Sequence, residues 1–415
     1  MMAEIDPARI EAIITKLVSF GTRNTMSNQT DPTFGIGAAR DWIASEMQSF
    51  AATSGGRMTV EVPSYLQTVS GAIIQDTVIS NVVATLKGSI DPERIYIVSG
   101  HYDSRVTNVS NFLSDSPGAD DDGSGVAVAM ELARVMATHR PAATIMFAAV
   151  AVAGEEQGLF GSTFMADTLA NASADIQGML NNDIVGSSTA DDGTKDPFDI
   201  RMFAQSIPPT ETLSDIESRV SIGAENDSPI RQLGRFVVEV ASNAVTQMNV
   251  QMVYRPDRFL RGGDHLPFID RGYPAVRFTE PHENFAHQHQ DVRVVDGVQF
   301  GDLTEFCDFE FNARVARVNG VALWSLAQAP GTPKGLSMDT SVLTNNSTLT
   351  WTADPAAAGY EVVWRASEDA FWTHVIPVGQ VSSTTILLSK DNAQLGVRAV
   401  GANGFKSPAA FPFTD

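Results

Sequence analysis

The sequence predicts an α/β fold, with helices on both faces of a mixed, mainly parallel sheet, followed by a small all-β sandwich. Three observations lead to this prediction. β-rich runs alternate with helical patterns up to about residue 327. A Pro- and Gly-rich stretch, AQAPGTPKG, then interrupts the pattern. Only short alternating strands follow it. We therefore divide the chain into one domain of residues 1–328 and another of residues 329–415.

Apolar residues at helical spacing predict the helices of the first domain. The first helix has an Asp-Pro start, which is typical of a helix N-terminus. The predicted helices are residues 6–20, 35–52, 126–137, 159–170, 228–248, 265–272 and 297–327. Between them, short runs of β-branched and other apolar residues predict strands at residues 78–88, 94–100, 143–154, 176–183, 250–256 and 274–281.

The second domain is predicted as a β-sandwich of five alternating segments separated by turn residues. These segments are residues 348–353, 359–366, 371–378, 383–389 and 394–402. The stretches LTW, GYEVVWR and GVRAVGANGFKSP resemble strands of a fibronectin type III module.

Composition narrows the possible partners. The net charge of −21 disfavours nucleic acid and anionic membranes, since both select clustered Lys and Arg. Cys307 is the one cysteine, so neither an internal disulfide nor a thiolate zinc cluster can form. No run of about 18 apolar residues predicts a membrane span, and the start, MMAEIDPARI, does not read as a signal peptide.

Three adjacent carboxylates, Asp120, Asp121 and Asp122, precede an apolar helix within PGADDDGSG. Neighbouring carboxylates repel one another, and the repulsion grows in a partly dry site. Helix capping is one explanation, since Asp is a good N-cap. A bound cation is the other.

Other potential ligands follow predicted strands. His101, the pair Glu155 and Glu156, Asp183 and His287 each come after a different strand. Because sites in open α/β sheets form outside the carboxyl ends of the strands, these side chains are expected at one edge. Imidazole nitrogens and carboxylate oxygens are suitable zinc donors.

Charge balance favours two metal ions. Asp121, Glu156 and Asp183 bring three negative charges, while His101 and His287 are neutral as ligands. Two Zn²⁺ and a bridging hydroxide neutralise this set, whereas a single zinc leaves it negative. The sequence therefore predicts two Zn²⁺ that share one carboxylate.

Five motifs in order, SGHYDS, GADDDGSG, GEEQGLFGS, NNDIVG and HQHQD, resemble the co-catalytic di-zinc aminopeptidases of clan MH, of the secreted bacterial leucyl aminopeptidase type. The resemblance covers residues 6–325. It implies that His101 and Asp183 bind one zinc, that Glu156 and His287 bind the other, and that Asp121 bridges both, with a cis peptide to Asp122.

The resemblance also implies the catalytic residues. Glu155 would be the general base, and Asp103 would orient the His101 imidazole. Three further histidines remain candidate ligands: His289, His282 and His265. The pair Arg258 and Arg261 either lines the substrate pocket or is a solvated basic pair.

The predicted function is zinc-dependent removal of the N-terminal residue from peptides by a metal-activated water. The alternatives are a carboxypeptidase or dipeptidase on the same zinc core, a glutaminyl cyclase, and a non-catalytic binding ectodomain. The expected partner is a peptide with a free N-terminus, without nucleic acid or membrane insertion. The family type predicts a secreted or periplasmic protein.

Overall fold

The structure is a computed structural model, and it describes residues 1–148 and 153–412. Its centre is an eight-stranded sheet with the order β1-β4-β6-β5-β7-β10-β8-β9. The strands are β1 Met58–Glu61, β4 Val83–Leu86, β5 Asp91–Ser99, β6 Ala143–Ala148, β7 Asp175–Asn182, β8 Asp199–Phe203, β9 Asn249–Val253 and β10 Ala275–Thr279.

The four strands in the middle of the sheet, β6, β5, β7 and β10, are parallel. Antiparallel pairing joins β4 to β6, β1 to β4 and β8 to β10, and β9 runs parallel to β8. The mixed, mainly parallel sheet predicted from the sequence is therefore confirmed. Its middle strands bury almost every side chain, as expected for strands covered on both faces.

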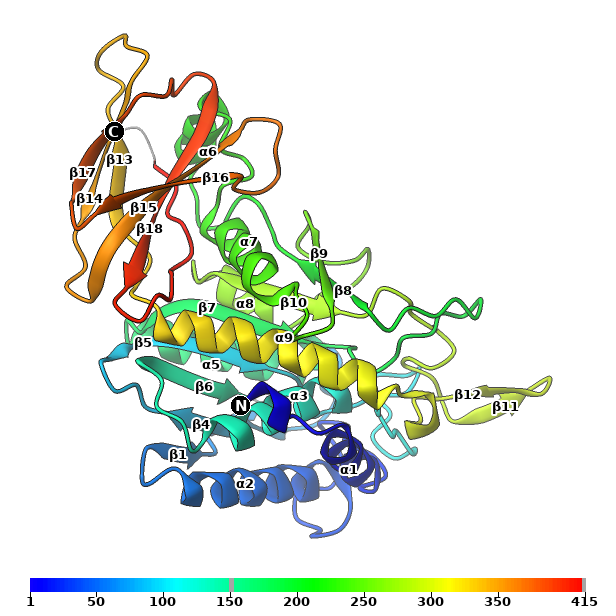
Figure 1. Ribbon diagram of the computed structural model, residues 1–415. Coiled ribbons are helices and arrows are strands. Elements are labelled where there is room, and N and C mark those ends of the chain that lie inside the picture. The colour runs from blue at the N-terminus through cyan, green and yellow to red at the C-terminus, as the bar shows by residue number, and fades with distance from the viewer. Residues whose placement is uncertain (149–152, 413–415) are drawn as a thin grey trace.

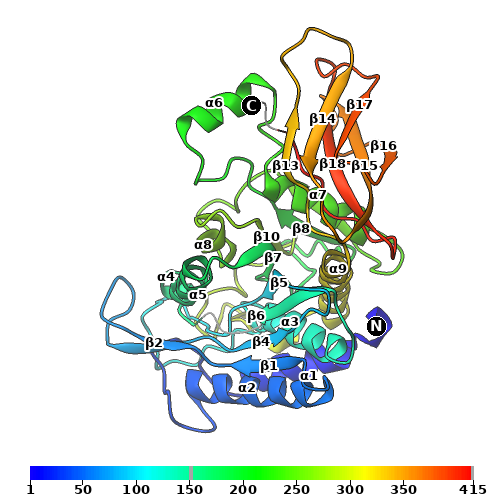
Figure 2. The same ribbon diagram turned by 90° about the vertical axis from the view of Figure 1, so that its left-hand side faces the viewer.

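The helices are α1 Pro7–Val18, α2 Gly35–Thr53, α3 Gly123–Met136, α4 Glu155–Gly158, α5 Phe160–Asn171, α6 Leu213–Ser221, α7 Pro229–Ala241, α8 His265–Ile269 and α9 Phe309–Gln328. Helices cover both faces of the eight-stranded sheet, whereas α6 lies apart from it, beside the C-terminal strands (Figure 1). Figure 2 shows α4, α5 and α8 on one side of the sheet, with α3 and α9 on the other and α2 beneath β1. Within the described residues, no helix is long and apolar enough to cross a membrane.

Two short hairpin-like pairs lie outside the main sheet. They are formed by β2 Ser64–Gln67 with β3 Thr77–Ser80, and by β11 Arg293–Val295 with β12 Val298–Phe300. The predicted strand 78–88 is thus divided between two sheets, β3 and β4. The predicted strand 143–154 is observed as β6, and residues 149–152 of it lie outside the described part of the chain.

The C-terminal part forms two three-stranded antiparallel sheets, β13-β14-β17 and β16-β15-β18. The strands are β13 Lys334–Met338, β14 Ser347–Thr352, β15 Ala357–Ala366, β16 His374–Gly379, β17 Ser383–Ile386 and β18 Ala393–Gly401. A hydrophobic cluster around Leu349, Val362 and Val397 fills the space between them, separate from the core of the larger sheet. The all-β sandwich is confirmed; the boundary at residues 328/329 and the fibronectin type III likeness stay predictions.

The sandwich rests on α7, beside α6 (Figure 1). Buried ion pairs join the two parts: Asp227 contacts Arg235 of α7 at 2.9 Å and Arg365 of β15 at 2.7 Å. The indole nitrogen of Trp372 also donates a hydrogen bond to Gln232, at 3.1 Å.

Candidate active site

The site forms at the carboxyl ends of β5 and β7, where the sequence predicted it. His101 follows β5 and is buried, with its Nε2 atom 3.1 Å from Asp121 Oδ1 and 3.9 Å from Asp183 Oδ1. Asp183 follows β7. Glu155 and Glu156 open the short helix α4, and Glu155 Oε2 lies 4.0 Å from His101 Nε2. The carboxyl ends of the parallel strands lie at the same edge of the sheet, and this brings together segments that are distant in the chain.

The three aspartates before α3 have three different roles. Asp120 accepts a hydrogen bond from the backbone N–H of Gly186, at 2.7 Å. Asp122 caps α3, accepting from Gly125 N–H, and accepts a second hydrogen bond from His101 N–H, both at 2.9 Å. The carboxylate of Asp121 faces the imidazole rings of His101 and His289. Capping and cation binding are therefore compatible explanations, because they apply to different members of the triplet.

The peptide bond between Asp121 and Asp122 is cis, as the family resemblance implied. Asp302, which the sequence reasoning missed, holds this part of the backbone. Its two carboxylate oxygens accept hydrogen bonds from the N–H groups of Asp120 and Asp121, each at 2.8 Å.

The expectation for the last histidine ligand needs correction. His289, rather than His287, reaches the site: its Nε2 atom lies 2.7 Å from Asp121 Oδ2 and 3.2 Å from Glu156 Oε2. The ring of His287 instead stacks on Phe306, with 3.5 Å between ring centroids and 5° between planes. His289 has a left-handed backbone, φ 53°, so the chain turns between the two histidines and sends their side chains to different places.

Potential ligand atoms form two groups, each within 4.8 Å. One group is His101, Glu155 and Asp183, and the other is Asp121, Glu156 and His289. Asp121 lies between them, because one of its oxygens faces His101 and the other faces His289. The donor set of imidazole nitrogen and carboxylate oxygen suits zinc. The Oε1 atom of Glu156 is buried without a hydrogen-bond partner among the described residues, so it has a lone pair to offer.

Asp103 lies beside the His101 ring. The His101 Nδ1 atom donates to the backbone carbonyl of Asp103 at 3.2 Å and lies 3.4 Å from its carboxylate Oδ1, on the side of the ring away from Asp121. The other carboxylate oxygen of Asp103 accepts hydrogen bonds from Thr25 Oγ1 and from Glu156 N–H, each at 3.2 Å. Asp103 therefore connects one potential ligand from each group.

The charges of the site compensate one another. Burial alone would lower the pKa of His101, but the carboxylates of Glu155, Asp103, Asp121 and Asp183 raise it well above its usual value. Burial acts the same way on His289, and Glu156 and Asp121 raise its pKa to about 9. Without a bound cation, the two imidazole rings are therefore protonated, and their positive charges balance part of the negative charge of the carboxylates.

Glu155 differs from the other carboxylates in its titration. Burial raises its pKa well above the usual range, and Asp183, Asp264 and Glu156 add to this, although His101 opposes it. A carboxylate with a raised pKa is better suited to accept and return a proton than an ordinary one.

Two residues near the site were given no role by the sequence reasoning. Arg277 of β10 forms ion pairs with Asp183 at 2.7 Å and Asp257 at 2.6 Å, and is almost fully buried. Asp264, next to His265, is completely buried, which raises its pKa to about 7. The GGDHLPF segment drew attention to His265, whose Nε2 atom instead donates to the Pro256 carbonyl at 2.9 Å.

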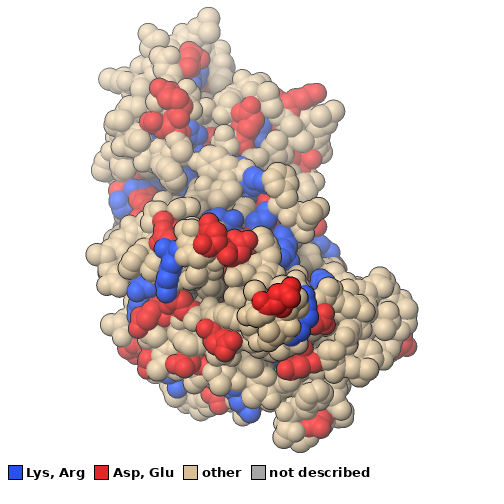
Figure 3. Space-filling view, turned by 90° about the vertical axis from the view of Figure 1, so that its right-hand side faces the viewer, with Lys and Arg blue, Asp and Glu red and all other residues tan. Residues whose placement is uncertain are grey.

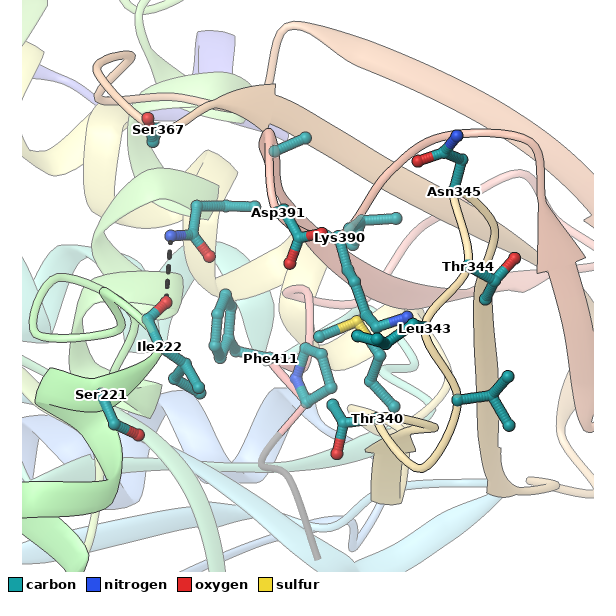
Figure 4. A pocket seen from close by; sticks show the side chains of 16 residues that line it. Ser221, Ile222, Thr340, Leu343, Thr344, Asn345, Ser367, Lys390, Asp391 and Phe411 are labelled. Atoms are coloured by element: carbon teal, nitrogen blue, oxygen red, sulfur yellow. Dashed lines mark hydrogen bonds between the residues drawn. The ribbon is translucent and has the colours of Figure 1, made fainter.

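A cavity of about 220 Å³ opens beside the two groups. Figure 3 looks onto this face of the molecule, where basic side chains gather near the middle, bordered by acidic ones. A larger cavity, of about 720 Å³, lies between the end of α6 and the C-terminal sandwich (Figure 4), where the Gln394 side chain donates to the Ile222 carbonyl at 3.4 Å. None of the candidate ligands lines that second cavity.

Comparison with known proteins places the chain in a family. The model of peptidase family M28 matches residues 81–295. A protein of Pyricularia oryzae named probable zinc metalloprotease is 60% identical over 420 residues, which cover 99% of this chain and 83% of that one. A protein of Pyrenophora teres f. teres with the same name is 58% identical, covering 100% of this chain and 86% of that one. The chain belongs to peptidase family M28.

Solved structures share the fold. Legionella pneumophila LapA has a TM-score of 0.54 at 19% identity, over 79% of this chain and 74% of that chain. An aminopeptidase from Aneurinibacillus has a TM-score of 0.53 at 16% identity, over 79% and 95%. A glutaminyl cyclase of Fimbriiglobus ruber has a TM-score of 0.51 at 16% identity, over 77% and 95%. One fold thus serves two reactions, so the reaction must be argued from the site.

Proposed function

We propose that this protein is a zinc-dependent aminopeptidase with two zinc ions. The observation that carries the proposal is the position of Asp121, whose two carboxylate oxygens face His101 and His289 in two adjacent ligand groups. A carboxylate placed in this way can be shared by two cations. His101 and Asp183 would hold one zinc, and Glu156 and His289 the other. The relatives named probable zinc metalloproteases support the choice of metal.

Bound zinc supplies a Lewis acid and lowers the pKa of a water molecule. Residues of the chain transfer the proton and orient the ligands. Glu155 takes the proton of the attacking water and returns it to the leaving amine, a role supported by its raised pKa and its place beside His101. The backbone carbonyl of Asp103 accepts a hydrogen bond from His101 Nδ1 at 3.2 Å, a contact that would hold the ring in orientation.

An attack on the N-terminal residue is favoured by the charge of the site. Glu155, which is not a proposed zinc ligand, borders the cavity and would attract a protonated α-amine, whereas zinc would neutralise Glu156 and Asp183. The test compares leucine amide with N-acetyl-leucine amide. We expect acetylation to remove most of the hydrolysis, because it deletes the charged contact and adds bulk. Equal rates on both substrates would contradict recognition of the amine.

A carboxypeptidase or dipeptidase is the second candidate, because arginines border the same cavity and could hold a terminal carboxylate. Faster hydrolysis of an N-blocked dipeptide than of leucine amide would favour it. A glutaminyl cyclase shares the fold. The position of Asp121 between two pairs of donors, His101 with Asp183 and Glu156 with His289, favours the two-metal hydrolase over a cyclase.

A further inference from the structure

Four arginines border the cavity beside the candidate metal site. They are Arg105, Arg258, Arg261 and Arg277. Guanidinium groups repel a protonated amine, so recognition of an amine alone does not account for four arginines next to the carboxylates. The question is which of these guanidinium groups are already neutralised by the protein.

The two terminal nitrogens of Arg277 are paired with the buried carboxylates of Asp183 and Asp257, so its charge is compensated by the protein. Arg258 also pairs with two carboxylates, since its Nε atom lies 3.3 Å from Asp257 Oδ1 and its Nη1 atom 2.5 Å from Glu283 Oε2. Its Nη2 atom, however, is buried without a hydrogen-bond partner among the described residues. An unpaired guanidinium nitrogen in a buried position is costly unless a ligand satisfies it.

Arg261 has no carboxylate among its partners within the described residues. Its Nη1 atom lies 2.8 Å from His289 Nδ1, and its Nη2 atom donates to Gln288 Oε1 at 3.2 Å. Arg105, by contrast, lies 3.9 Å from Glu156 Oε2 and donates to the carbonyl groups of Val106 and Thr107. Arg261 therefore brings to the cavity a positive charge that no carboxylate of the described residues pairs with.

We propose that Arg261 and Arg258 bind a carboxylate of the substrate next to the scissile bond. The inference rests on the proposed peptidase function and deepens it, by naming the substrate class: short peptides with a carboxylate close to the reacting carbonyl. Guanidinium groups bind carboxylates in paired hydrogen bonds. The cavity of about 220 Å³ is below the roughly 300–1,000 Å³ typical of larger ligand sites, which fits a short substrate.

The carboxylate has two possible sources, the C-terminus of a dipeptide and an acidic side chain, and matched substrate pairs separate them. The first pair is Leu-Ala and Leu-Ala amide, and the second is Glu-Ala amide and Gln-Ala amide. We expect the KM of the zinc-loaded protein to be at least about tenfold lower for the charged member of one pair, as expected for a charge-assisted hydrogen bond. The pair that shows the difference identifies the source.

The variants Arg261→Gln and Arg258→Gln then test the anchor. Each is expected to shrink the KM difference within the discriminating pair, while Arg261→Lys restores part of it. Because Arg258 also pairs with Glu283 and its variant can misfold, Arg261→Gln is the decisive one. Arg293→Gln is the matched control, since Arg293 is exposed on β11 and does not border the cavity. It should keep the full difference.

Equal KM values within both pairs, or a difference that survives in Arg261→Gln, would overturn the inference while leaving the peptidase proposal intact. If no member is hydrolysed, the peptidase proposal fails separately. The same pairs are then compared by calorimetric binding to the zinc-loaded protein, where the inference requires the same tenfold preference and its loss in Arg261→Gln.

Discussion

Asp121 lies between two imidazoles, with Oδ1 at 3.1 Å from His101 Nε2 and Oδ2 at 2.7 Å from His289 Nε2. This relationship joins the loop after β5 to the loop after β10, two segments far apart in the sequence. It also makes His289, rather than its neighbour His287, the proposed ligand.

The two histidines give a matched pair of variants. His289→Ala should lower the zinc content of the purified protein by about one ion per chain, because it removes one of three donors in its group. His287→Ala should leave the zinc content unchanged, since its ring stacks on Phe306. Zinc is measured by elemental analysis. The opposite pattern would restore His287 as the ligand.

Glu155 is expected to move protons rather than to hold metal. Glu155→Gln should therefore retain its zinc while hydrolysis of leucine amide falls by roughly 10²- to 10⁴-fold. The amide preserves the shape of the side chain and removes its basicity. Metal content and rate are measured on the same preparation. A loss of zinc in proportion to the loss of rate would make Glu155 a ligand.

Much of the fold was predictable because apolar runs and helix-start residues mark its elements in the sequence. The middle strands are apolar runs, and Pro7 and Pro229 mark true helix starts after the capping residues Asp6 and Ser228. The predicted helix 228–248 was too long. α7 ends at Ala241, where Thr246 Oγ1 donates to the Ala241 carbonyl and replaces the next helical turn.

A second error has a recognisable signal. The predicted helix 297–327 begins late, at Phe309, because its first residues form the β12 strand. Val295 pairs with Val298 across a two-residue turn of Asp296 and Gly297, both with positive φ. An Asp-Gly pair between β-branched residues is a hairpin signal.

The site was predictable in its residue types but not in its supporting contacts. His101, Asp121, Glu155, Glu156 and Asp183 follow strands or open a helix, and this position brings them together. Asp302 and Arg277 act only through tertiary contacts with the site, so no spacing in the sequence marks them. His287 and His289 are two residues apart, and only the backbone turn at His289 separates their roles.

The contact between the sandwich and the larger sheet depends on Asp227. Asp227→Ala leaves Arg235 and Arg365 buried without their shared anion, so we expect the free energy of unfolding to fall by about 3 kcal/mol. The control is Glu239→Gln, since half-exposed Glu239 pairs with Arg398 and should cost less than about 1 kcal/mol. Urea unfolding measures both. Equal losses in the two variants would contradict the buried role of Asp227.

His265 makes stability depend on pH. Burial lowers its pKa to about 4, below its usual 6.5, so the unfolded chain binds this proton more readily than the folded protein. Above about pH 6.5, the difference between the two pKa values does not change the free energy of unfolding. As the pH falls from 6.5 towards 4, it lowers the free energy of unfolding, because the unfolded chain gains the proton first. Between pH 7 and pH 5, the wild type should lose about 2 kcal/mol more than His265→Gln. The same loss in both proteins, measured by urea unfolding at each pH, would show that His265 does not titrate in this way.

The central claim is that two zinc ions share Asp121 and that hydrolysis depends on both. The most direct measurement is a zinc titration of the metal-stripped protein, with bound zinc and hydrolysis of leucine amide followed together. The account predicts two zinc ions per chain and full activity only near that ratio. It also predicts that Asp121→Asn binds at most one, whereas Asp120→Asn, whose oxygen still accepts from Gly186, binds two. A plateau at one zinc with full activity, or equal zinc loss in both variants, would contradict the shared role of Asp121.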